Sequence, residues 1–208
     1  TRGTTTIADG DGVLINDAGT MRQTNVTTLA TYMGTKIGGG LVFIASTDVS
    51  NAATISFTGF DASLYDSYIF SLGHILPATD GAYFSALLSV DNGDNYLSAS
   101  DSYTGPAFES LSAGDQPSMR VGYYGVGNGA GEGICGTMEL NHPHLNASTL
   151  LTGPAGVQYA VAGGGLVTAA TQPAVKTKAA TVVDAIQFKF LSGNIASGTI
   201  SMYGRVNA

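Results

Sequence analysis

The chain has 208 residues, a length that accommodates one sizeable domain together with an accessory segment. Only 11% of the residues are charged, the net charge is -7, and the eight Lys and Arg residues are scattered, which argues against a nucleic-acid partner because such partners require clustered basic residues. No apolar run approaches the ~20 residues of a membrane-spanning helix, so membrane insertion is not expected. The weakly charged surface instead predicts burial against other protein, as in a permanent oligomer.

The first 40 residues contain signals for a turn, a strand and a helix in succession. The letters VLI at 13–15 lie between DGDG and NDAG and predict a short strand bounded by turns. Residues 25–37 predict an amphipathic helix, with Thr24 or Asn25 as its N-cap, because apolar residues recur there at intervals of three and four. These apolar residues are Val26, Leu29, Tyr32, Met33 and Ile37. Three glycines at 38–40 then predict a hinge.

After the glycines the hydrophobic period changes to two. Eight strand-length segments rich in β-branched and aromatic residues follow, separated by turn clusters. They are LVFIAS (41–46), TISFTGF (54–60), SYIFSLGHI (67–75), AYFSALLSV (82–90), MRVGYYGV (119–126), GICGTMEL (133–140), DAIQFKF (184–190) and GTISMYGRV (198–206). The predicted fold is mainly β: a jelly-roll-type antiparallel β-sandwich over residues 41–208, preceded by a short N-terminal strand and an amphipathic helix within residues 1–40.

The spaced aspartates of DGDG suggest a calcium loop, which requires oxygen ligands at positions 1, 3 and 5, Gly at 6 and Glu at 12. Asp9 and Asp11 fit the first two positions. Val13, Leu14 and Thr20 occupy the other three, so the match fails. Turn-forming Asp and Gly ahead of a strand is the favoured interpretation.

The letters HPH at 142–144 place two imidazoles at alternate positions, where they can point the same way. With Gly136 six residues before His142, the spacing resembles the opening of the cupin metal motif. The Glu of that motif is absent, and no His follows His144. Nearby in the sequence, further ligands would have to come from Glu132, Cys135 or Glu139. A surface loop with two His residues is the favoured interpretation, so neither a metal nor another cofactor is predicted.

No catalytic constellation stands out. A nucleophilic serine in a G-x-S-x-G turn is absent, and no pair of carboxylates is singled out by its context. The chain is therefore expected not to be an enzyme. Tyrosines in or beside predicted loops are candidates for stacking on sugar rings of a host glycan, or alternatively fill the core with their hydroxyls at its rim. They are Tyr96, Tyr103, Tyr123 and Tyr124.

Residues 9–34, DGDGVLINDAGTMRQTNVTTLATYMG, resemble the short unit of aspartate-rich strand, polar turn and helix found in virion structural proteins of tailed bacteriophages, often fibre-like ones. Residues 39–70 and 188–206 resemble the β-rich domain that commonly follows this unit. The resemblance implies a structural component of the virion, assembled in the host cytoplasm and exposed on the particle.

Within such a particle, a tail fibre or appendage involved in host attachment is favoured. A capsid decoration or head-fibre protein is the alternative, and a virion-associated polysaccharide-degrading enzyme is less favoured. The expected partners are copies of the chain, with a trimer favoured, other virion proteins and a host surface glycan. Residues 1–40 would serve as an attachment and oligomerisation segment through the apolar helix face, and the loops at 92–103 and 123–132 would face the host.

Overall fold

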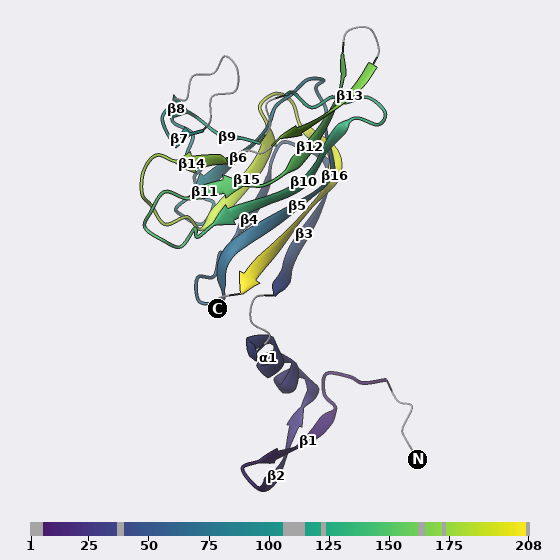
Figure 1. Ribbon diagram of the computed structural model, residues 1–208, viewed down its shortest axis with the longest axis vertical. Coiled ribbons are helices and arrows are strands. Elements are labelled where there is room, and N and C mark those ends of the chain that lie inside the picture. Colours follow the sequence, from purple (N-terminus) through teal and green to yellow (C-terminus); the bar gives the residue numbers. More distant parts are fainter. Residues whose placement is uncertain are drawn as a thin grey trace. The chain divides into compact units, whose positions relative to one another are not determined.

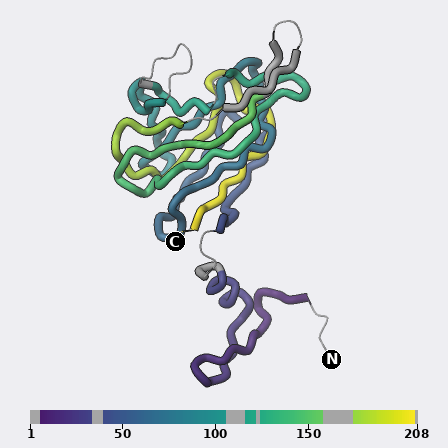
Figure 2. Tube along the Cα trace, in the orientation of Figure 1, coloured from purple at the N-terminus to yellow at the C-terminus, as the bar shows by residue number. Residues whose placement is uncertain are grey.

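The computed structural model describes residues 6–36, 40–105, 115–121, 124–161, 165–171 and 174–206. The chain divides into two compact units, Thr1–Gly40 and Leu41–Asn207 (Figures 1 and 2). As predicted, it is mainly β, and its described part holds one short helix. None of the described helices is long and apolar enough to cross a membrane.

The first unit begins with an antiparallel hairpin of β1 (Gly12–Asp17) and β2 (Thr20–Asn25). Ala18 and Gly19, which connect the strands, have φ angles of 50° and 94°. Positive φ at both central residues is the geometry of tight hairpin turns, and the Asn16 side-chain oxygen accepts a hydrogen bond from Gly19 N at 2.7 Å. The strand predicted at 13–15 is confirmed. Its partner β2, TMRQTN, has too little apolar character to have been predicted.

Helix α1 (Val26–Lys36) follows directly. The Asn25 side-chain oxygen accepts a hydrogen bond from Thr28 N at 2.7 Å, so Asn25 is the N-cap. The carbonyls of Asp11 and Asp9 accept hydrogen bonds from Val26 N at 3.0 Å and Thr27 N at 3.3 Å. The first N–H groups of a helix have no hydrogen-bond partner inside the helix. The DGDG turn and Asn25 together supply acceptors for the first three N–H groups of α1. The predicted hinge lies almost wholly outside the described residues.

The second unit is built around eight strands, each overlapping one of the eight predicted segments. They are β3 (Leu41–Ala52), β4 (Ile55–Thr58), β5 (Tyr65–Pro77), β6 (Phe84–Ser89), β9 (Met119–Arg120), β10 (Gly133–Asn141), β15 (Ala185–Phe190) and β16 (Ile195–Val206). One sheet has the order β3-β16-β5-β10 and the other the order β4-β15-β6-β9, and all pairs are antiparallel (Figure 1). The first sheet thus combines the first, eighth, third and sixth strands, and the second combines the second, seventh, fourth and fifth, which is the jelly-roll arrangement.

A continuous apolar core lies between these sheets. Phe70 of β5 packs against Phe57 and Phe188 of the opposite sheet, with ring centroids 5.6 and 5.1 Å apart. Along β5, Tyr68 and Phe70 are buried on the inner face of the sheet, while Ile69 between them points to the outer face. The period-two alternation of apolar residues that was predicted from the sequence therefore corresponds to the inner and outer faces of the sheet.

The larger sheet continues beyond β10 through strands that the sequence did not predict. These are β7 (Tyr103–Thr104), β8 (Asp115–Gln116), β11 (Leu150–Thr152), β12 (Ala155–Val161), β13 (Gly165–Thr171) and β14 (Ala174–Thr177). β11 and β12 both pair with β10, at its two ends, and β14, β7 and β8 follow β11. Several are short or built largely of Ala, Gly and Thr, so they carry little period-two apolar signal.

Candidate functional site

The predicted oligomer interface lies on α1. Val26 and Leu29 are half-buried within the first unit, whereas Tyr32, with 60% of its surface exposed, and Met33 point to solvent. Ile37, the fifth predicted interface residue, lies outside the described residues. The described part of this predicted face is therefore partly covered by the hairpin and partly open.

The hairpin of the first unit adds further exposed apolar side chains. Leu14 is 71% exposed, and Met21 and Ile15 are also exposed. Ile15 lines a groove between hairpin and helix together with Leu29 and Tyr32. Among the described side chains of residues 6–33, none is buried. This unit consequently has secondary structure but no buried core of its own in the described part of the chain.

The DGDG stretch forms a turn, as the favoured interpretation proposed. The Asp11 carboxylate accepts a hydrogen bond from Ala8 N at 2.8 Å, and the backbone carbonyls of Asp9 and Asp11 are occupied by α1. Within the described ranges, neither aspartate belongs to a group of three close metal-ligating side chains. The stretch caps the helix.

The tyrosines proposed for glycan binding differ in how far they are buried. Tyr103 is fully buried, so the prediction that its ring stacks on a sugar is wrong. Its hydroxyl donates a hydrogen bond to Leu97 O at 2.9 Å and accepts one from Leu88 N at 2.8 Å. Burial raises the pKa of the Tyr103 hydroxyl to about 12. Tyr103 is thus a structural residue, as the alternative interpretation held.

Among the remaining three, Tyr96 is half-buried and packs against the core. Tyr124 is 38% exposed and is the described member of the set with the most accessible ring. Tyr123 lies outside the described residues. Where the structure describes these tyrosines, only Tyr124 therefore offers an exposed aromatic surface for a sugar.

Hydrogen bonds hold both loops that were expected to face the host. In the first, Asn95 donates to the Asp91 carboxylate from its side chain and its backbone, both at 2.8 Å. These bonds, with one from Ser89, hold the pKa of the Asp91 carboxyl below its usual value. In the second, Glu132 is buried, and its carboxylate accepts a hydrogen bond from Gly129 N at 2.5 Å.

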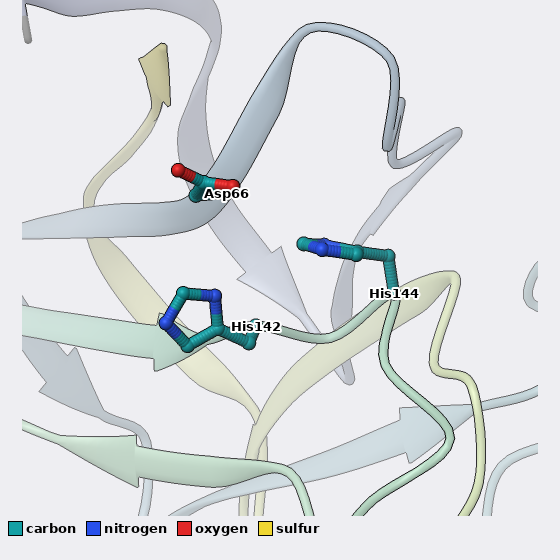
Figure 3. Close-up of side chains that lie close together, drawn as sticks. All are labelled: Asp66, His142 and His144. Atoms are coloured by element: carbon teal, nitrogen blue, oxygen red, sulfur yellow. The ribbon is translucent and has the colours of Figure 1, made fainter. Parts of the chain in front are cut away.

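The HPH stretch proves to be part of a three-residue cluster. Figure 3 shows the side chains of Asp66, His142 and His144 pointing toward one another. Each offers one ligand atom, and these three atoms lie within 4.8 Å of one another. The two imidazole rings have centroids 6.0 Å apart and planes at 79°.

Strand register explains why these residues meet. β5 and β10 pair with Asn141 opposite Ser67, so the next positions of the same register are His142 and Asp66. Asp66 lies two residues before the buried Tyr68, and His142 lies two residues after the buried Leu140. Asp66 lies where the pairing of β5 with β16 shifts register, and His142 directly follows the end of β10, so the pairing of β5 with β10 brings the two residues to the same end of the larger sheet.

The loop that carries the two histidines is fastened at several points. Leu145 N donates a hydrogen bond to His142 O at 3.1 Å, and Val183 N donates one to Pro143 O at 2.8 Å. His142 itself has a φ of 44°, an uncommon value for a non-glycine residue. The backbone on which both imidazoles are mounted is therefore defined by the fold around it.

The additional metal ligands that were considered from the sequence, Glu132, Cys135 and Glu139, do not belong to this cluster. Glu139 lies on the outer face, where it accepts a hydrogen bond from Ser67 Oγ at 2.7 Å and pairs with Arg205 at 3.1 Å. Glu132 is bound to its own glycine loop, and Cys135 lies near the other end of β10. Asp66 was missed because it precedes His142 by a long stretch of chain and only strand pairing brings the two together. An acidic residue at the start of a predicted strand was its sole sequence signal.

Comparison with protein-family models, with curated proteins and with solved structures finds no match for this chain. What the chain does must therefore be argued from its own residues.

Proposed function

We propose that the chain is a structural component of a bacteriophage particle, namely a tail fibre or other appendage protein that takes part in host attachment, and that it has no enzymatic activity. The resemblance of residues 9–34, 39–70 and 188–206 to phage virion proteins supports the particle assignment. The jelly-roll arrangement is compatible with it, since viral capsid domains use this fold.

The observation that carries the proposal is the surface of the first unit. Its described side chains include none that is buried, while Leu14, Met21, Tyr32 and Met33 are exposed. A unit of about 40 residues rarely buries enough apolar surface to be stable alone, and oligomerisation is a common remedy. We therefore assign the unit to attachment and to self-association, and a trimer is favoured because fibre-like phage proteins are commonly threefold.

The second unit would carry host recognition on its loops. Tyr124 is exposed and could stack on a sugar ring, while the nearby polar groups could bind hydroxyls. With few charges in these loops, each site would bind weakly, and several copies acting together would supply the avidity.

Immuno-gold labelling of intact particles tests the assignment. Gold on the tail or its appendages is the expected result. Gold on the capsid would instead support the decoration or head-fibre alternative. Particles that carry no label, with lysate protein labelled as a positive control, would overturn the proposal that this is a virion protein.

Substitution of Leu29 by Asp tests self-association. We expect the variant to dissociate, because a charge within an apolar contact between copies loses its hydration without gaining a partner. Thr31→Asp is the matched control, since it adds the same charge to the other side of the same helix, where Thr31 is exposed. Multi-angle light scattering reports the mass. A parent protein that is monomeric at micromolar concentration, or a Leu29→Asp variant that stays assembled, would contradict the interface.

The absence of enzymatic activity is tested separately. Purified protein incubated with host surface polysaccharide should leave the chain-length distribution unchanged. Shortened polysaccharide would favour the depolymerase alternative.

A further inference from the structure

We propose that Asp66, His142 and His144 form a binding site for one divalent transition-metal ion of the Zn²⁺ type. The inference is independent of the function proposed above, because it depends only on three side chains of the second unit. It revises the sequence-based expectation that no metal is bound.

The donor set selects the class of ion. Two imidazoles and one carboxylate suit zinc and its first-row neighbours, whereas Ca²⁺ and Mg²⁺ favour sites made of oxygen alone. Three protein ligands leave one position of a tetrahedral ion unfilled, as in zinc sites that also bind water. Because His142 is exposed, the fourth position would be open to solvent.

The geometry lies within reach of coordination. Ligand atoms at about 2.0–2.1 Å from a tetrahedral zinc ion are about 3.3 Å from one another. The three ligand atoms here lie within 4.8 Å of one another, so each pair must close by at most about 1.5 Å. Rotation of side chains about their own bonds can supply such a shift, while the strands and the fastened loop keep the backbone in place.

One polar atom of the cluster is buried without a hydrogen-bond partner, which favours a ligand over a simple side-chain pair. Among the described residues, none of the three side chains forms a hydrogen bond or an ion pair, although an Asp beside two His residues would ordinarily do so. The Nδ1 atom of His144 is buried without a hydrogen-bond partner. A buried nitrogen without a partner is costly, and a metal ion coordinated by Nδ1 would remove that cost.

Isothermal titration of ZnCl₂ into the 208-residue chain, untagged and first stripped with a chelator, tests the proposal. We expect one ion per chain. His142→Ala and Asp66→Asn should each weaken binding about tenfold or more, since even the outer partners of metal ligands commonly contribute that much. His142 is exposed and Asn is isosteric with Asp, so both variants should fold, which circular dichroism checks.

His74→Ala is the matched control. His74 is the remaining histidine of the chain, is exposed and lies outside the cluster, so this variant should bind zinc as the parent does. Substitution of Co²⁺ for Zn²⁺ should give the visible absorption of a four-coordinate ion, and His142→Ala should need about tenfold or more Co²⁺ to reach half of that absorption. A parent chain that binds no zinc, or binding as tight as the parent's in both cluster variants, or binding that is lost in His74→Ala, would overturn the proposal.

Discussion

Replacing Tyr103 by Phe should destabilise the sandwich, although the change removes a single oxygen atom. The Tyr103 hydroxyl is fully buried and accepts a hydrogen bond from Leu88 N while donating one to Leu97 O. Leu88 belongs to β6, and among the described residues the pairing of β6 with its neighbour β9 involves Ser85 and Ala86 but does not reach Leu88. The Tyr103 hydroxyl therefore accepts the hydrogen bond of the Leu88 amide beyond the end of the β6–β9 pairing, where β9 offers no backbone partner.

The magnitude follows from what the substitution leaves behind. The apolar ring stays, so no cavity larger than the missing oxygen forms. A buried amide without a partner costs roughly 1–3 kcal/mol. Because the half-buried Leu97 carbonyl can be partly hydrated, we expect the loss to come mainly from the Leu88 amide and to total about 2 kcal/mol. For a domain of this size, that loss lowers Tm by about 4–8 °C.

Thermal unfolding followed by circular dichroism, together with urea denaturation, would measure the change. Tyr65→Phe is the matched control, because the Tyr65 ring is half-buried but its hydroxyl makes no hydrogen bond with the described residues. If Tyr103→Phe is no more destabilising than Tyr65→Phe, the structural role assigned to the Tyr103 hydroxyl is refuted, and a role in binding would have to be reconsidered.

Three other outcomes are expected. Burial raises the pKa of Tyr103 to about 12, so its contribution to stability is complete below pH ~10 and is lost as the pH rises through 12. The loss is roughly 3 kcal/mol, and Tyr103→Phe should therefore lose less stability than the parent across this interval in urea titrations. Gly136→Ala should cost roughly 3 kcal/mol in the same assay, since φ is 146° and a Cβ would meet Pro154 O at 2.4 Å, while Gly156→Ala, with only an ordinary contact, should be nearly neutral. Asn25→Ala should weaken α1 by about 1 kcal/mol and accelerate amide hydrogen exchange in its first turn about fivefold; unchanged exchange would show that the cap is dispensable.

The candidate metal site illustrates how far local sequence can lead. The two imidazoles were visible as HPH, and their alternate spacing predicted that they could act together. The third member of the cluster, Asp66, is distant from them in the sequence, whereas the nearby candidates Glu132, Cys135 and Glu139 lie outside the cluster. Glu139 lies between Met138 and Leu140 on β10. Both of these neighbours point into the core, so Glu139 must point outward because side chains alternate along a strand.

Period-two apolar alternation determined the eight core strands, because a strand that buries one face must alternate whatever its partners are. Cap and turn chemistry likewise determined the start of α1, since an N-cap requires only an oxygen three residues before an amide. These features are local, so the sequence alone was sufficient to predict them.

Only the tertiary structure decided which strands are neighbours, that β11 to β14 extend the larger sheet, that Tyr103 is buried, and that Asp66 lies beside His142. Each of these depends on pairing between segments distant in the chain, and that pairing is selected by the packing of the whole core. Strands β11 and β12 form where β10 offers them hydrogen bonds, and β13, rich in Ala, Gly and Thr, in turn pairs with β12, a condition that no local pattern of residues records.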